Sequence, residues 1–216
     1  MNFVTARHNM VASQIQPNNV TDSFVIRAMA AVPREEFVPK AMRGIAYMDE
    51  DLDLGAGRYL LEPMVLARLL QAAAIEPEHV VLDIGCATGY STAVLARMAS
   101  TVLAVECDPA LAGAATEALI RAGIDNAAVV TGPLEQGYPA QAPYNVIIFE
   151  GAVTAVPEPV RNQLADGGRL VVIIEDGGIG RGTLITRTGN VFGTRVLFEA
   201  NAPRLPGFAQ APVFVF

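Results

Sequence analysis

The sequence predicts an α/β protein with a doubly wound, mostly parallel seven-stranded sheet, an N-terminal helical extension and an antiparallel C-terminal strand pair. Short runs rich in Val and Ile, such as 79–84 and 144–149, alternate with helical patterns. Continuous apolar runs of this length are typical of parallel strands that are buried on both faces. The composition agrees, because 52% of the 216 residues are hydrophobic and the mean hydropathy is +0.36. The alternation of strand and helix patterns ends after residue 176, where turn residues predict a hairpin.

Residues 1–62 mix helical patterning with irregular stretches. Apolar residues recur at helical spacing from Met10 until Pro17, which should end that helix. Asp22 can cap a second helix that runs to about residue 31. Segment 32–39 is bounded by prolines, and segment 49–57 carries four acids and two glycines, so we expect both to be irregular.

Residues 63–176 should form the core of the fold. Helices are expected over 63–74, 90–99, 109–122 and 157–164, and strands over 79–84, 101–106, 127–131, 144–149 and 169–174. Alternation at this spacing implies parallel strands joined by right-handed crossovers.

The glycine-rich segment 177–182 is interpreted as a flexible loop, followed by strands over 183–187 and 195–199 around the turn Gly189-Asn190. The proline-containing tail 203–216 should be mostly irregular. Its last four residues could form a strand on the domain or a dimer contact. We expect a single domain over 1–216, with an extension (1–62), a core (63–176) and a hairpin with tail (177–216).

Charge and composition exclude several classes of partner. The formal net charge is −7, which disfavours a general affinity for nucleic acid. No apolar run approaches the roughly 18 residues that span a bilayer, so no membrane partner is expected. The first residues lack the pattern of a secretory signal, so we expect a cytoplasmic protein. Its two cysteines, Cys86 and Cys107, should then be reduced.

The turn that follows the strand 79–84 predicts a cofactor site. In a doubly wound sheet, ligands bind beyond the carboxyl ends of the strands, and the first strand–turn–helix unit is the usual place. The dinucleotide pattern fails here because Tyr90 takes the place of its third glycine, and no P-loop sequence occurs. The spacing Asp-x-Gly-x-Ala-x-Gly instead resembles motif I of the class I S-adenosylmethionine-dependent methyltransferases. The candidate cofactor residues of this turn are Asp83, Gly85, Cys86, Ala87, Thr88 and Gly89.

A second signal is Glu106, which ends the next predicted strand and precedes Cys107. A carboxylate at that position can accept hydrogen bonds from both hydroxyls of a ribose. Cys86 and Cys107 would then both flank the cofactor crevice. No metal cluster or catalytic triad is evident, so we expect no metal, and the catalytic residue stays unassigned.

The chain as a whole resembles the protein-L-isoaspartate O-methyltransferase family, over about residues 7–200. The most specific match is segment 32–39 (VPREEFVP), and further matches lie at 54–57, 81–90 and 163–171. The resemblance implies the Rossmann-like fold of class I methyltransferases and methyl transfer from S-adenosylmethionine to the carboxylate of isoaspartyl residues in damaged proteins. An ionised carboxylate needs no general base to attack a methyl group, so alignment can supply most of the rate.

The departures from the family pattern fall at the ligand. The acceptor loop, which in the family contains Gln-Thr-Ile-Ser, is here Arg58, Tyr59, Leu60, Leu61 and Glu62. The family serine, associated with the acceptor and catalysis, aligns with Leu61, which has no hydroxyl. Backbone groups could still recognise the acceptor.

Two further departures concern the cofactor and the charge of the crevice. Pro133 replaces the family aspartate that would meet the adenine amino group, which leaves Leu134 and backbone groups to hold the base. Glu150 stands where the family usually has a small neutral residue. Its carboxylate could bind a cationic acceptor or the sulfonium, would repel an anionic substrate if ionised, or could be a solvated loop acid.

Three hypotheses remain open from the sequence. The first is a carboxyl methyltransferase that acts on isoaspartyl proteins or peptides. The second is a methyltransferase of the same fold with another acceptor, such as a small molecule. The third is a cofactor-binding protein with little catalysis.

Overall fold

The computed structural model describes residues 2–208. Its helices are α1 (Phe3–Met10), α2 (Ser23–Ala31), α3 (Pro63–Ala73), α4 (Tyr90–Ala96), α5 (Pro109–Arg121) and α6 (Glu158–Arg161). Its strands are β1 (Leu52–Gly55), β2 (Arg58–Leu60), β3 (Val80–Ile84), β4 (Thr101–Glu106), β5 (Ala127–Thr131), β6 (Tyr144–Val153), β7 (Leu164–Asp176), β8 (Ile179–Thr188) and β9 (Val191–Glu199). Residues 213–216, for which the sequence left a strand or a dimer contact open, lie outside the described residues.

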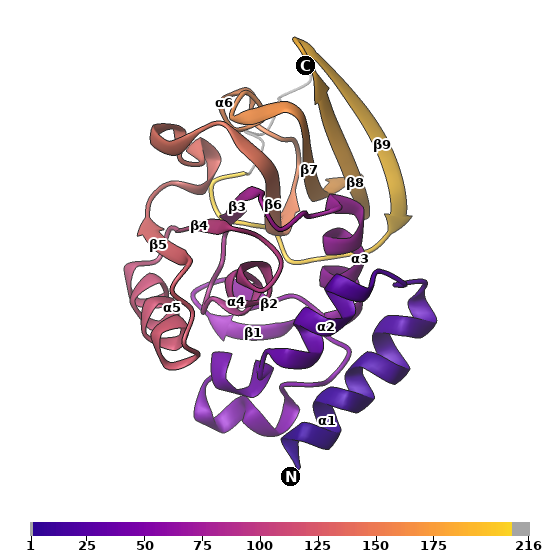
Figure 1. Ribbon diagram of the computed structural model, residues 1–216, viewed down its shortest axis with the longest axis vertical. Coiled ribbons are helices and arrows are strands. Elements are labelled where there is room, and N and C mark those ends of the chain that lie inside the picture. Colours follow the sequence, from indigo (N-terminus) through magenta and orange to yellow (C-terminus); the bar gives the residue numbers. More distant parts are fainter. Residues whose placement is uncertain (1, 209–216) are drawn as a thin grey trace, which may run out of the picture.

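The central sheet has seven strands in the order β5-β4-β3-β6-β7-β8-β9 (Figure 1). The first five strands are parallel to one another, β8 is antiparallel to β7, and β9 is antiparallel to β8. The predicted fold class is therefore confirmed. The strand order reverses between β3 and β6, and in such sheets a ligand crevice opens beyond the carboxyl ends of these two strands.

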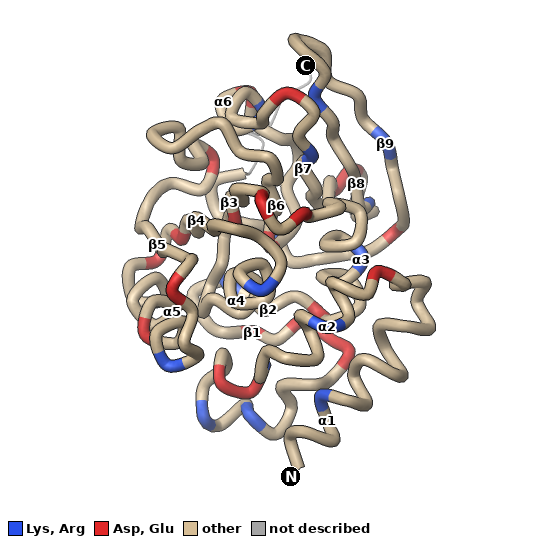
Figure 2. The backbone as a smooth tube through the Cα atoms, viewed as in Figure 1, with Lys and Arg blue, Asp and Glu red and all other residues tan. Residues whose placement is uncertain are grey.

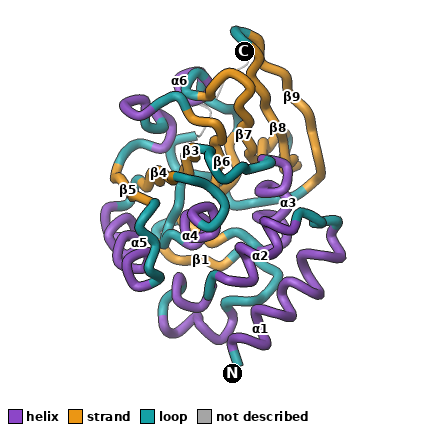
Figure 3. Tube along the Cα trace, in the orientation of Figure 1, coloured by secondary structure: helices purple, strands orange, loops and turns teal. Residues whose placement is uncertain are grey.

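Side chains of the parallel strands alternate between two apolar cores, one on each face of the sheet. Val81 of β3 packs on the side that holds α3 and α4, whereas Leu82 and Ile84 pack on the opposite side. The N-terminal helices extend the first layer at one end of the molecule (Figure 3). The second core includes α6 and also Leu205 and Phe208, which follow the last strand. The C-terminal segment thus contributes to covering that face.

Segment 49–57 is not the loop that its acids and glycines predicted. It contains most of a hairpin in which β1 pairs with β2 as a separate two-stranded sheet. Gly55, Ala56 and Gly57 all have positive φ, which builds the tight turn. The side chain of Asp53 supports it by accepting from the backbone N–H of Gly55 at 2.8 Å.

The prediction of a flexible loop over 177–182 was also wrong. Only Gly177 and Gly178 form the turn, with φ of +59° and +82°, and β8 begins at Ile179. Gly182 lies within β8. A glycine is needed there because a Cβ would meet the Phe198 ring at 2.6 Å. These glycines allow close packing, which a linear sequence does not distinguish from flexibility.

The boundaries of several other elements also differ from those predicted. The helix expected at 157–164 ends at Arg161, and Leu164 already belongs to β7. Segment 32–39 contains a 3₁₀ turn over Arg34–Phe37. Within residues 2–208, no helix has the length and apolar character needed to cross a bilayer. Lys and Arg residues are spread over many elements (Figure 2).

The N-terminal cap of α2 offers a test of the local structure. Asp22 accepts from the backbone N–H groups of Phe24 and Val25 at 2.7 and 3.4 Å. Asp22→Ala should lower the free energy of unfolding by about 1 kcal/mol, because these helix donors lose their acceptor. Urea unfolding followed by circular dichroism measures this loss. The exposed Asp125→Ala serves as the control, and equal losses in both variants would contradict the capping role.

Candidate functional site

The predicted cofactor turn lies between β3 and α4 and is held tightly. Gly85, Ala87 and Gly89 have φ of +83°, +48° and +88°, so the backbone turns in the left-handed region. The N–H of Gly85 donates to the carbonyl of Val105 in the neighbouring strand at 2.8 Å. Gly89 also allows close packing, because a Cβ there would lie 3.1 Å from that of Ala115.

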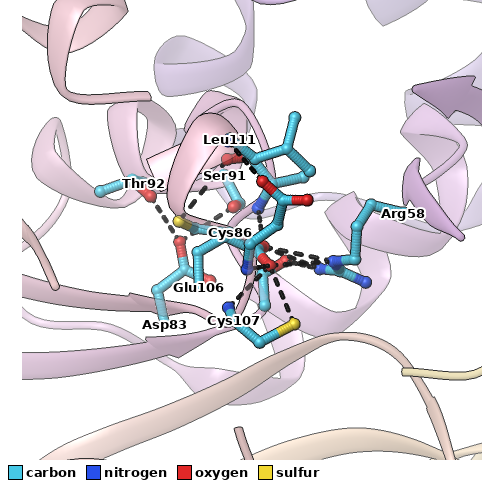
Figure 4. Close-up of polar contacts among 11 residues, drawn as sticks. Arg58, Asp83, Cys86, Ser91, Thr92, Glu106, Cys107 and Leu111 are labelled. Carbon is cyan, nitrogen blue, oxygen red and sulfur yellow. Dashed lines mark hydrogen bonds and ion pairs between the residues drawn. The ribbon is translucent and has the colours of Figure 1, made fainter. Parts of the chain in front are cut away.

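Asp83 ties the end of β3 to α4. Its Oδ2 accepts from the hydroxyls of Ser91 at 2.9 Å and Thr92 at 2.7 Å (Figure 4). Burial raises the pKa of Asp83 to about 6, although both hydroxyl bonds lower it. Its other oxygen, Oδ1, is buried without a hydrogen-bond partner among the described residues. The carboxyl group therefore offers one unused acceptor beneath the turn.

Glu106 is fully buried at the end of β4, where its carboxylate accepts hydrogen bonds from backbone N–H groups. The N–H of Ala87 donates to Oε2 at 2.8 Å. The N–H groups of Cys107 and Asp108 donate to Oε1 at 2.8 and 3.1 Å. These three bonds join the cofactor turn to the segment after β4, so the structure brings together the two sequence signals for a cofactor.

Arg58 of β2 completes the environment of Glu106. Its Nε lies 3.2 and 3.3 Å from the two carboxylate oxygens, and its Nη2 lies 3.2 Å from Oε2 (Figure 4). The same Nη2 donates to the carbonyl oxygen of Gly85 at 2.5 Å. Arg58 is only 2% exposed. The sequence placed Arg58 in the acceptor loop and did not indicate that it reaches the cofactor turn.

The rest of the acceptor loop is only partly buried, because Tyr59 and Glu62 are partly exposed. The side chains of Leu60 and Leu61 are buried. The carbonyl of Leu61 accepts from Nη2 of Arg34 at 2.6 Å, while Nε of Arg34 donates to the carbonyl of Ala46 at 2.7 Å. Arg34 also stacks 4.8 Å from the ring centre of Tyr90. The most specific segment of the sequence therefore holds the acceptor loop against the helix that follows the turn.

A C-terminal strap, defined here as residues 202–208, crosses the carboxyl end of β6. The N–H of Ala152 donates to the carbonyl of Pro203, and the N–H of Leu205 donates to the carbonyl of Ala152, both at 2.8 Å. Phe208 packs edge-on against Phe149 with ring centres 5.7 Å apart. The sequence predicted an irregular tail here but gave no indication that it lies over the crevice.

Glu150 lies beside the strap and is 5% exposed, so it is not a solvated loop acid. Burial, and then the nearby Asp83, raises its pKa well above the ordinary value for a glutamate. Its Oε1 has no hydrogen-bond partner among the described residues. Glu150 and Asp83 thus provide two buried carboxyl groups with unused oxygens, at the ends of adjacent strands.

The other residues predicted to bind the cofactor are Thr88, Leu134, Cys86 and Cys107. The hydroxyl of Thr88 donates to the carbonyl of Phe37. Leu134 is buried in the second core, in the 3₁₀ turn that follows Pro133. Cys86 is buried and Cys107 partly buried, and neither forms a disulfide. Burial raises the pKa of Cys107 to about 11, so its thiol is protonated and lies 3.3 Å from Oε1 of Glu106.

Residues 5–192 match the model of the family described as Protein-L-isoaspartate(D-aspartate) O-methyltransferase. The chain belongs to this family. The family consists of S-adenosylmethionine-dependent methyltransferases.

Two relatives show how far the family likeness extends. A protein-L-isoaspartate O-methyltransferase of Methanoculleus marisnigri is 40% identical over 165 residues, which cover 76% of this chain and 75% of that protein. Another, from Roseiflexus castenholzii, is 37% identical over 97% of this chain and 96% of that protein.

Solved structures of the family share the fold. One named protein-L-isoaspartate O-methyltransferase superposes with a TM-score of 0.81 at 26% identity, covering 93% of this chain and 66% of that longer one. A Plasmodium falciparum structure, described as a complex with S-adenosyl-L-homocysteine, has a TM-score of 0.76 at 20% identity. It covers 94% of this chain and 99% of that one, and at this identity it supports the fold alone.

The buried Arg58–Glu106 pair should be strongly coupled. In the ligand-free protein, Glu106→Ala should lower the free energy of unfolding by about 3–5 kcal/mol, because it leaves a buried cation without its partner. A double variant with Arg58→Met should recover part of that loss, since both charges are then gone. Urea unfolding of the two single variants and the double variant measures the coupling. Additive losses would contradict it.

An exposed ion pair supplies the control for this cycle. Glu117 and Arg121 lie 3.6 Å apart on the surface of α5, with side chains 76% and 59% exposed. Glu117→Ala should cause a much smaller loss, because solvent screens the pair.

Glu62 should make the stability of the protein depend on pH. Burial, and then Asp51, Asp49 and Glu50, raises its pKa from 4.5 to about 7. The folded state therefore retains a proton that the unfolded state releases, so this contribution falls as the pH rises from about 4.5 to about 7. Glu62→Gln should be more stable than the wild type at pH 8, by about 1 kcal/mol after allowance for solvent screening.

Urea unfolding of the wild type and Glu62→Gln at several pH values checks this expectation. The two proteins should differ little at about pH 3.5, where the wild-type carboxyl is protonated in both states. A difference that does not change between pH 4.5 and pH 8 would refute the assignment to Glu62.

Proposed function

We propose that this protein is an S-adenosylmethionine-dependent O-methyltransferase that acts on the carboxylate of isoaspartyl residues in proteins or peptides. Family membership supports the reaction class. The observation that carries the proposal to this chain is the set of acceptors at the crevice: the Glu106 carboxylate, the Gly85 carbonyl, and the unpartnered oxygens of Asp83 and Glu150. We also propose that residues 1–216 act as one methyltransferase domain.

These acceptors fit the chemistry of the cofactor. S-adenosylmethionine carries a ribose diol and an α-ammonium group, which are donors, and it has no phosphate. The anionic crevice would suit it and would disfavour a nucleotide phosphate. Glu106 would hold the ribose, and the Gly85 carbonyl with Asp83 would hold the ammonium group. When bound, the cofactor supplies an electrophilic methyl group.

The residues of the crevice would act by alignment and by excluding water. An acceptor carboxylate is ionised at neutral pH, so it attacks without a general base. The buried side chains of Leu61 and Leu205 would keep water away from the site. Burial raises the pKa of Glu150 well above its ordinary value, which would weaken the repulsion that an ionised glutamate exerts on an anionic acceptor.

The loss of the family serine favours a second candidate function. Leu61 offers no hydroxyl to an acceptor, and its side chain is 1% exposed. A methyltransferase of the same architecture with a small-molecule acceptor accounts for this change.

A methylation assay tests the proposal. The pure protein is incubated with radiolabelled S-adenosylmethionine and with paired peptides that contain isoaspartate or aspartate at one position. We expect base-labile methyl esters on the isoaspartyl peptide only, because alignment in the crevice distinguishes the two carboxylates. Equal labelling of the pair, or none, would reject the isoaspartyl function.

Two further measurements separate the alternatives. Transfer of label to a low-molecular-mass fraction of a lysate, without peptide labelling, would favour the small-molecule acceptor. Calorimetric binding of S-adenosylhomocysteine without any transfer would favour a binding protein with little catalysis.

A further inference from the structure

Arg58 takes the acceptors that the proposed cofactor requires. Its Nε and Nη2 lie within 3.3 Å of the Glu106 carboxylate, and its Nη2 also donates to the carbonyl of Gly85 at 2.5 Å. One guanidinium group therefore bonds both to the carboxylate proposed for the ribose and to the carbonyl proposed for the ammonium group. We propose that Arg58 competes intramolecularly with the cofactor, which binds by displacing this guanidinium.

The space above the turn supports the same conclusion. A Cβ built on Gly85 would meet Nη2 of Arg58 at 2.7 Å and the Leu205 side chain at 2.8 Å. A Cβ on Gly151 would meet the carbonyl of Pro203 at 2.8 Å and Leu205 at 2.9 Å. The glycines that permit close approach of a ligand are thus already in contact with the chain itself.

The two partners of the ion pair differ in how firmly they are held. Glu106 is fixed by three backbone N–H groups and lies in the central sheet. Arg58 belongs to the short hairpin β1–β2, which forms its own sheet and has no strand pairing with the central one. Displacement therefore moves Arg58 and leaves Glu106 in place, with its backbone donors still paired.

Competition of this kind lowers the apparent affinity for the cofactor. Only the fraction of molecules in which Arg58 has left Glu106 can bind, so the apparent Kd rises in proportion. Glutamine at this position would be a shorter and uncharged side chain that could not form the ion pair. The inference rests on the proposed cofactor, and it assigns to Arg58 the control of affinity.

Arg58→Gln tests the inference by binding alone. Isothermal titration calorimetry with S-adenosylhomocysteine should give a Kd at least about ten-fold lower for Arg58→Gln than for the wild type. Arg43→Gln is the matched control, because Arg43 forms an exposed ion pair with Glu36 at 2.8 Å, and it should bind as the wild type does. An unchanged or higher Kd for folded Arg58→Gln would overturn the inference.

Arg58→Lys provides a second variant if removal of the charge prevents folding. Lysine keeps the charge but lacks the planar fork that contacts Glu106 and Gly85 together. Its Kd should lie between those of the wild type and Arg58→Gln, and no gain over the wild type would overturn the inference.

The outcomes also separate this inference from the proposed function. Tighter binding by Arg58→Gln without isoaspartyl methylation would support competition and reject the function. If the wild type methylates the isoaspartyl peptide but both proteins bind S-adenosylhomocysteine equally, the function is supported and the competition is rejected. Failure of both proteins to bind S-adenosylhomocysteine would overturn the competition and the cofactor together.

Discussion

The carboxylate of Glu106 connects three parts of the chain that are distant in sequence. It receives the N–H of Ala87 from the turn after β3, the N–H groups of Cys107 and Asp108, and the guanidinium of Arg58 from β2. A buried carboxylate is strongly destabilising unless such donors surround it. The geometry of the crevice depends on this requirement, because the turn, the start of α5 and the β1–β2 hairpin are each positioned by it.

The unusual features of the acceptor loop follow from its inward packing. Arg58 is bound to Glu106, Leu61 is buried, and Arg34 holds the carbonyl of Leu61. Three residues of the loop that was expected to meet an acceptor, Arg58, Leu60 and Leu61, are therefore buried. The strap adds to this packing, because Leu205 reaches Gly85 and Gly151. The side chains of Arg58 and Leu205 thus lie close to Gly85 of the turn.

The acids of the crevice differ in whether their carboxyl oxygens are paired. Glu106 has a cation and three backbone donors, whereas Glu150 and Asp83 each keep an oxygen without a partner. Burial raises the pKa of both groups, because the charged form of a carboxyl group is destabilised away from water.

The sequence by itself determined the sheet, the position of the turn between β3 and α4, and the family. Runs such as 79–84 and the spacing Asp83 to Gly89 are local patterns, and local patterns follow from backbone geometry and burial. The sequence predicted loops at two places where the structure has strands, because Gly182 and the 52–60 hairpin resemble loops in composition. Only the tertiary structure decided that Arg58 meets Glu106 and that the strap covers β6. Those contacts join residues 48 or more positions apart, and no spacing within the sequence encodes which buried donor a distant carboxylate will find.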